Sequence, residues 1–260
     1  MSQSLYVHFH PEERPFVDRA LEWVERAAER HAPVVTDFLD PRQQFILQSI
    51  AGREPNAVLR LDGGYPEAER KRAVIVPAYR DPEDVDCGIV VLAVEASGGK
   101  FLELDHGDYL GALLGLGIKR DVIGDLHVRD DGCHCLVTEE MAGFLHTHLN
   151  QVHRVPVRTD ILPRESLQVV QPEMDVTVIT VASLRLDGVA SDVLRISRSK
   201  ILDPIRAGRC RVNWKTEEDP SVRLEEGDIV SFKGFGRFKI LKVDGPTKSG
   251  RLRVSIGKFI

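Results

Sequence analysis

Hydrophobic side chains recur at intervals of three and four residues near the start of the chain, at Val17, Leu21, Val24 and Ala28. This spacing places them on one face and predicts an amphipathic helix. A second helix is expected from Asp40, because Asp caps helices and the following Pro41 suits the first helical position. Gly52 lies near its expected end, and two short strands are predicted at residues 57–61 and 73–78.

The pattern changes after an acidic, proline-containing stretch at residues 81–86, where we expect a domain boundary. Strand and helix patterns then alternate. The predicted strands are residues 88–95, 122–128, 133–137 and 152–157, and the predicted helices begin at Asp105 or Asp108 and at Thr138. The order βαββαβ predicts a ferredoxin-like sandwich. Its third strand reads C-H-C-L-V-T and lacks the aromatic residues on which RNA-binding sheets stack bases, so we do not expect stacking there.

The last part of the chain predicts two short helices followed by a group of strands. A connector with a short strand at residues 167–170 comes first. The helices are expected at residues 186–193 and 198–206, with Ser197 as a cap and with Pro204 kinking or shortening the second helix. The strands are expected at residues 209–213, 229–233, 238–243 and 252–256.

These patterns together predict an α+β protein with three domains. Residues 1–82 form a small α/β N-terminal domain, residues 83–172 the ferredoxin-like central domain, and residues 173–260 a C-terminal domain.

Charge is divided unevenly along the chain. Its 260 residues carry 35 Lys+Arg and 40 Asp+Glu, a net charge of −5, which alone argues against a nucleic-acid partner. However, residues 1–182 hold 18 basic and 30 acidic residues, a net −12, whereas residues 183–260 hold 17 basic and 10 acidic residues, a net +7. A basic segment behind an acidic body indicates a module that binds polyanions, although a solvated basic surface without a partner is the alternative.

Cysteine content and hydropathy indicate a cytoplasmic protein. Four cysteines in 260 residues are too few for a disulfide framework, and charged residues occupy the start of the chain where a signal peptide would be apolar. The longest apolar stretches fall short of the ~20 residues that span a bilayer, so we expect no membrane association.

Four segments of the basic part resemble the S-four RNA-binding domain, also called the αL module. They are L-R-L-D at residues 184–187, S-R-S-K at 197–200, I-R-A-G-R-C-R-V-N at 205–213 and E-G-D-I-V at 226–230. In that family two short helices and a following turn present basic side chains to structured RNA. The resemblance implies RNA phosphate contacts at Arg185, Arg198, Lys200, Arg206 and Arg209, and at Lys215 in the turn. Such contacts position RNA without reading its sequence.

Three longer segments resemble the YlmH family of bacterial proteins. They are G-G-Y-P-E-A-E-R-K-R-A at residues 63–73, H-G-D-Y-L-G-A-L-L-G-L-G-I-K-R-D-V-I-G-D at 106–125 and K-G-F-G-R-F-K at 233–239. Membership implies association with rRNA and tRNA in the large ribosomal subunit, in the rescue of stalled translation. It also implies a cell-division protein as a second kind of partner.

Two basic spots lie outside the C-terminal domain. Arg70, Lys71 and Arg72 alternate with acidic residues, which is typical of a solvated loop, and Lys119 and Arg120 follow a helix end, where cations are favourable. The alternative for both spots is a second RNA contact that would add affinity.

Candidate metal ligands and catalytic motifs do not form a recognisable site in the sequence. Cys133, Cys135, His146 and His148 supply ligand types, but the spacing of a structural zinc site is absent, so neither a metal nor another cofactor is expected. No nucleophile elbow or His-Glu-x-x-His pair occurs, and we expect no enzymatic activity.

Two alternatives to a ribosome-binding protein stay open at this point. One is an RNA-modifying enzyme in which residues 1–172 are catalytic and the basic tail tethers RNA. The other is a cell-division adaptor whose acidic body binds a protein.

Overall fold

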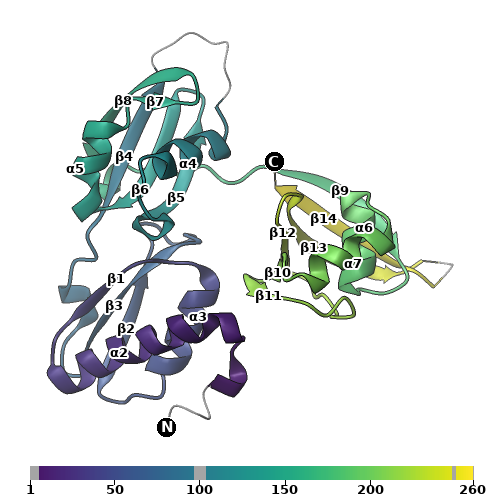
Figure 1. Cartoon of the computed structure of the whole chain (residues 1–260), viewed down its shortest axis with the longest axis horizontal. Helices are drawn as coiled ribbons and strands as arrows, with labels where there is room; N and C mark the ends of the chain where they lie inside the picture. The colour runs from purple at the N-terminus through teal and green to yellow at the C-terminus, as the bar shows by residue number, and fades with distance from the viewer. Residues whose placement is uncertain (1–5, 97–103, 248–249, 260) are drawn as a thin grey trace. The chain divides into compact units, whose positions relative to one another are not determined.

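The computed structural model describes residues 6–96, 104–247 and 250–259. The chain divides into two compact units, Met1–Gln171 and Pro172–Ile260. The predicted boundary between residues 82 and 83 falls inside the first unit and stays a prediction. Figure 1 shows the elements of each unit.

The first half of the first unit is a three-stranded antiparallel sheet with two helices. After the 3-10 turns η1 (Tyr6–His8) and η2 (Pro11–Glu13), its elements are α2 (Arg14–Arg30), β1 (Val34–Leu39), α3 (Pro41–Ala51), β2 (Ala57–Asp62) and β3 (Lys71–Pro77), with strand order β1-β3-β2. Both predicted helices are confirmed, and Asp40 and Gln43 form the reciprocal hydrogen bonds of a capping box. Strand β1 was not predicted.

The second half of the first unit confirms the ferredoxin-like arrangement. Its elements are η3 (Pro82–Asp84), β4 (Ile89–Ala96), α4 (His106–Gly115), η4 (Arg120–Val122), β5 (Ile123–Arg129), β6 (Gly132–Thr138), α5 (Glu139–His148), β7 (Gln151–Val152) and β8 (Val155–Leu162). The sheet order is β5-β6-β4-β8-β7, which is the split βαβ pattern with one short edge strand added. Helices α4 and α5 bury Tyr109, Leu113, Ala142 and Leu145 in the core of this half.

A shared hydrophobic cluster joins the two halves of the first unit. Phe38, Val74 and Val76 from β1 and β3 pack with residues of β4 and β6, including Val91 and Leu136. Gly124 on β5 permits this approach, since a Cβ there would lie 2.7 Å from the ring of Phe38. The two halves therefore form one continuous packed body.

The segment after β8 lies against the face of the sheet opposite α4 and α5. After η5 (Arg164–Ser166), the backbone N–H of Gln168 donates to the ring of buried His134, and that of Val170 donates to the ring of buried His127, each at 3.2 Å. The predicted strand at residues 167–170 is therefore wrong, because these backbone groups bond to side chains and not to a neighbouring strand.

The second unit packs two helices on a six-stranded antiparallel sheet. Its elements are β9 (Met174–Val181), α6 (Leu186–Leu194), α7 (Arg198–Arg206), β10 (Cys210–Val212), β11 (Lys215–Thr216), β12 (Ile229–Phe232), β13 (Gly236–Pro246) and β14 (Leu252–Phe259), with strand order β11-β10-β12-β13-β14-β9. Leu186, Val189, Ile201 and Ile205 meet sheet residues such as Phe238 in its core. Helix α7 is not shortened at Pro204, which lies in the last turn and so interrupts little of the helix.

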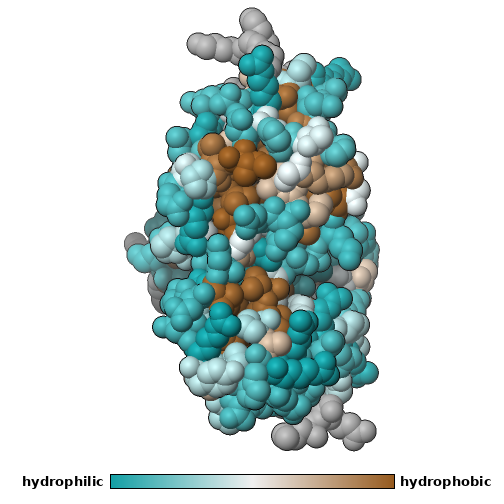
Figure 2. Space-filling model, turned by 90° about the vertical axis from the view of Figure 1, so that its left-hand side faces the viewer, coloured by the Kyte–Doolittle hydropathy of each residue, from teal (hydrophilic) through white to brown (hydrophobic). Residues whose placement is uncertain are grey.

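The face drawn in Figure 2 is mainly hydrophilic, with separate hydrophobic areas. Among the helices of the described residues, none is long and apolar enough to cross a membrane.

Candidate nucleic-acid interface

Two of the predicted RNA-binding arginines share one acidic partner at the start of α6. Arg185 donates to both carboxylate oxygens of Asp187, at 3.2 and 3.3 Å, and Arg198 at the start of α7 donates to one of them at 3.1 Å. The side chain of Asp187 is only 11% exposed, whereas those of Arg185 and Arg198 are 45% and 61% exposed. Asp187 therefore positions two guanidinium groups whose outer edges still face solvent.

The ionisation of Asp187 is secured by these contacts. Burial would raise its pKa, but the hydrogen bonds from Arg185, Arg198 and the backbone of Gly188, together with the charge of Arg198, hold the pKa below its usual value. The carboxylate is thus charged at neutral pH and keeps both arginines in place.

The other predicted RNA-binding residues are exposed along α7 and the strands that follow it. They are Lys200, Arg206, Arg209 and Lys215. Among the described residues, none offers these four side chains an ion pair. Cations that form no ion pair with a described residue remain available to phosphate.

Two residues that the sequence interpretation missed lie beside Lys200. A groove of about 400 Å³ is lined by Arg195, Ile196, Ser197, Lys200 and Phe235. Arg195 caps α6 in the left-handed conformation, at φ 55°, and Phe235 occupies the turn between β12 and β13. A signal for Phe235 was present in the sequence, since it stands between two glycines in a basic segment.

The two predicted basic spots of the first unit are arranged differently, and their three arginines bond to backbone oxygens. Arg72 is buried and donates to the carbonyls of Thr36, at 2.6 Å, and Gly88, at 2.8 Å. Arg70 donates to the carbonyls of Ile123 and Phe38, at 3.2 and 3.0 Å. These bonds join the two halves of the unit, so the guanidinium groups are committed to the fold.

Arg120 is the third inward-facing arginine. It donates to the carbonyls of Ile123 and Gly124. Burial, together with the nearby charge of Arg70, lowers its pKa to about 10. We therefore leave Arg70, Arg72 and Arg120 out of the proposed second RNA contact, for which Lys71 and Lys119 remain.

Asp125 anchors the loop between β2 and β3. Its carboxylate accepts hydrogen bonds from the Tyr65 hydroxyl, at 2.9 Å, and from the backbone N–H groups of Glu69, at 2.7 Å, and Arg70, at 3.1 Å. The loop thus has a fixed course from β2 to β3.

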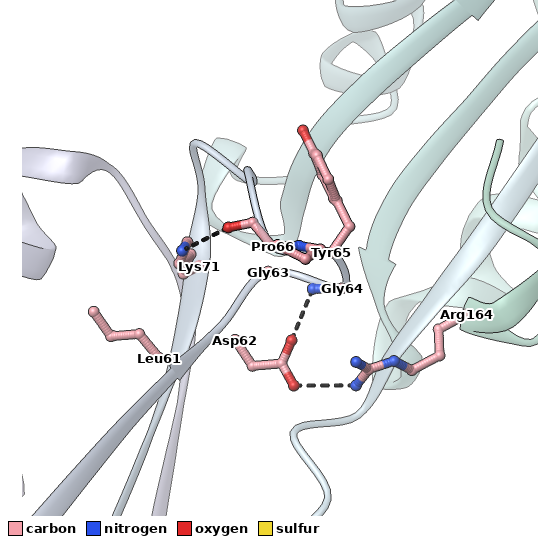
Figure 3. Close-up of a pocket in the computed structure, with 8 residues that line it drawn as sticks. All are labelled: Leu61, Asp62, Gly63, Gly64, Tyr65, Pro66, Lys71 and Arg164. Atoms are coloured by element: carbon pink, nitrogen blue, oxygen red, sulfur yellow. Dashed lines mark hydrogen bonds and ion pairs between the residues drawn. The ribbon is translucent and has the colours of Figure 1, made fainter. Parts of the chain in front are cut away.

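The same loop borders a cavity of about 360 Å³ (Figure 3). Asp62 at its floor accepts from the backbone of Gly64, at 2.8 Å, and from Arg164, at 3.0 Å. Lys71 lines the cavity and donates to the carbonyl of Pro66 at 3.3 Å. Within this cavity Asp62 and Arg164 neutralise one another, whereas Lys71 bonds to an uncharged carbonyl.

The candidate metal ligands are dispersed. Cys133 and Cys135 are fully buried in β6, with their Sγ atoms 3.6 Å apart. The Nδ1 atom of His146 contacts the Thr159 hydroxyl, and that of His148 contacts the carbonyl of Phe144. Within the described ranges, no group of three or more His, Cys, Asp or Glu side chains is placed to hold a metal ion.

Comparison with known proteins gives two family-model matches in the first unit. Residues 12–80 match the model described as "YlmH, N-terminal", and residues 82–166 match "Putative RNA-binding domain in YlmH".

A curated relative and a solved structure extend these matches. The chain is 38% identical over 251 residues, 96% of its length and 97% of the relative's, to "Ribosome-associated protein quality control protein P2" from Bacillus subtilis (strain 168). It is 26% identical to "Cell division protein ylmH from Streptococcus pneumoniae", with a TM-score of 0.54 over 62% of this chain and 98% of the solved one. The similarity to the curated relative extends over nearly the whole of both chains, and the chain belongs to the YlmH family.

Proposed function

We propose that this protein binds RNA on the ribosome and acts in the quality control of stalled translation. The observation that carries the proposal is the exposed set of cations on α7 and the adjoining strands, at Lys200, Arg206, Arg209 and Lys215. The printed name of the Bacillus subtilis relative supports the ribosomal role, and the model matched by residues 82–166 supports RNA binding.

More specifically, we propose that the protein binds both rRNA and tRNA within the large ribosomal subunit. Arg185 and Arg198, positioned by Asp187, would add two guanidinium groups to the phosphate contacts. A paired guanidinium retains N–H groups that point away from the carboxylate, so it can bridge Asp187 and a phosphate. The contacts would fit the shape and phosphate spacing of folded RNA and would be strongly salt-dependent.

Charge reversal at Arg206 and Arg209 tests this function most directly. In the full-length chain, Arg206→Glu together with Arg209→Glu should weaken co-sedimentation with purified large ribosomal subunits about 100-fold and reduce the salt dependence of binding. Arg19→Glu together with Arg53→Glu makes the same charge change at exposed positions of the first unit and should leave binding unchanged. If both pairs weakened binding equally, the net charge of the protein and not this surface would account for binding. If the first pair did not weaken binding, Arg206 and Arg209 would not belong to the interface.

A second candidate function is association with a cell-division protein. The printed name of the Streptococcus pneumoniae structure favours it, and the acidic first unit would supply the surface. Capture of a septal protein from nuclease-treated lysate by residues 1–171, a compact unit of the fold, would support this function independently of RNA.

The protein is proposed to act by binding and without catalysis. A purified full-length chain should therefore leave labelled rRNA and tRNA chemically unchanged. Turnover of either RNA that is lost when residues 1–172 are deleted would instead establish the RNA-modifying enzyme.

A further inference from the structure

Phe235 is a large aromatic side chain held out at a turn. It is 48% exposed and lies in the three-residue connection between β12 and β13, where its N–H donates to the carbonyl of Phe232 at 3.0 Å. Gly234 and Gly236 on either side have φ values of 87° and 97°, which favour glycine. A Cβ at either glycine would meet nothing within 4 Å, so backbone conformation and not space requires glycine there. The turn is thus built to present the ring.

The surroundings of the ring are basic. Arg195 and Lys200 line the same groove, together with Ile196 and the hydroxyl-bearing Ser197. Neither cation forms an ion pair with any residue that the structure describes, and no acidic side chain lines the groove. This differs from Arg185 and Arg198, whose charges are compensated by Asp187.

The groove is also connected to the proposed RNA surface. The backbone N–H of Lys233, which begins the turn, donates to the carbonyl of Arg209 at 3.0 Å. The volume of about 400 Å³ falls within the range of sites that hold small ligands, about 300–1,000 Å³. An aromatic ring beside two unpaired cations matches the chemistry of a nucleotide, which has a flat base and an anionic phosphate.

We propose that this groove binds one unpaired nucleotide of RNA, with its base stacked on Phe235 and its phosphates bound by Arg195 and Lys200. The proposal rests on the RNA-binding function above and gives it a substrate class, namely RNA with a base that is free to leave the helix. The helix surface of Arg206 and Arg209 binds phosphates of paired RNA, whereas the groove selects RNA that also offers an unpaired base.

The test uses the full-length chain and two RNA hairpins of the same stem sequence. One hairpin is fully paired, and the other carries a single bulged 2-aminopurine, whose fluorescence reports stacking. Wild-type protein should bind the bulged hairpin about tenfold more tightly than the paired one and change its 2-aminopurine emission, because stacking on an aromatic ring adds to the phosphate contacts.

Substitutions of Phe235 then distinguish stacking on an aromatic ring from hydrophobic contact alone. Phe235→Leu should lose the tenfold preference and the emission change while still binding the paired hairpin, and Phe235→Trp should keep both. Phe45→Ala removes a ring of similar exposure, 55%, from α3 and should behave as wild type. Thermal unfolding of each variant checks that it is folded.

Three results would overturn the proposal. Phe235→Leu could keep the preference for the bulged hairpin, or it could weaken both hairpins equally. Phe235→Trp could lose the preference. In each case, if wild-type protein still bound the paired hairpin, the proposed RNA-binding function would still be supported. If wild-type protein bound neither hairpin nor large ribosomal subunits, the proposed function itself would fail.

Discussion

The two units use the arginines of their predicted RNA contacts in opposite ways. In the first unit Arg70, Arg72 and Arg120 point inward and donate to backbone carbonyls that join the two halves. In the second unit Arg206 and Arg209 are exposed and have no ion-pair partner among the described residues. The sequence segments look alike, since both are basic and interleaved with small or acidic residues.

The difference is set by unpaired acceptors in the surrounding fold. Strand β1 shifts register between Val35 and Phe38, which takes the carbonyl of Thr36 out of the β1–β3 ladder. Arg72 fills this gap, and the Thr36 hydroxyl accepts from the N–H of Ala73 at 2.9 Å. Leaving a buried carbonyl without a hydrogen-bond donor costs free energy. Such a carbonyl therefore holds a guanidinium group within the fold and away from solvent. An arginine is free for RNA only where the fold offers it no such acceptor.

The largest expected effect is on Arg72. Arg72→Met should lower the free energy of unfolding of the first unit by about 3 kcal/mol, because the buried carbonyl of Thr36 and the partly buried carbonyl of Gly88 lose a charged donor. Urea unfolding followed by Trp23 fluorescence, in a chain carrying Trp214→Phe, measures this loss. Lys71→Met, at the neighbouring half-exposed position, should change it by less than about 0.5 kcal/mol. If Arg72→Met kept its stability but bound RNA more weakly, Arg72 would serve RNA binding and not the fold.

A smaller effect is expected at Asp187, where the two uses of arginine meet. Asp187→Asn should destabilise the second unit by about 1 kcal/mol at neutral pH, a modest value because both arginine partners are largely exposed. The folded-state pKa of Asp187 is lowered, so this stability is present above the unfolded value, about 3.9, and is lost as the pH falls through the folded value.

Urea unfolding followed by Trp214 fluorescence at several pH values, in a chain carrying Trp23→Phe, checks the prediction at Asp187. The difference between wild type and Asp187→Asn should shrink toward zero in strong acid. A difference that stays constant with pH would show that the charge of Asp187 contributes nothing.

The smallest effect is expected at the remaining basic residues of the first unit. Lys119 is exposed and Lys71 is half-buried. Lys71→Met together with Lys119→Met should weaken ribosome binding about threefold at low salt and leave unfolding unchanged, since each lysine would contribute one solvent-screened contact. Co-sedimentation at two salt concentrations measures it, and unchanged binding would confine the interface to the second unit.

Hydrophobic spacing and turn residues predicted most helices and most of the central sheet, but the predicted strand at residues 152–157 is divided into β7 and β8 by a turn at His153 and Arg154. Strands β1 and β9 escaped prediction for different reasons. Strand β1 is irregular because of its register shift. Strand β9 lies at the edge of its sheet with Val176 and Val178 exposed and Val181 buried, so its alternation of apolar and polar residues changes phase between Val178 and Ile179.

For the candidate site, sequence similarity indicated which segment is basic but not how each cation is used. Whether Arg198 is paired depends on the position of Asp187, eleven residues earlier, across the contact between α6 and α7. The burial of Arg72 depends on Gly88 and Thr36, which are distant in sequence. The two glycines beside Phe235 are visible in the sequence, but its place beside Lys200 depends on α7 and the β12–β13 turn lining one groove.

The buried thiols make this chain convenient for site-directed labelling. All four cysteines are buried, and burial raises the pKa of Cys87 to about 11 and that of Cys210 to about 12. Only a thiolate reacts readily with maleimides, so the native cysteines should stay unmodified in the folded protein. A single cysteine introduced at exposed Lys215 would carry a photocrosslinker or fluorophore without removal of any native thiol. Attachment of the probe to a neighbouring nucleotide would then map the contact surface on intact ribosomes.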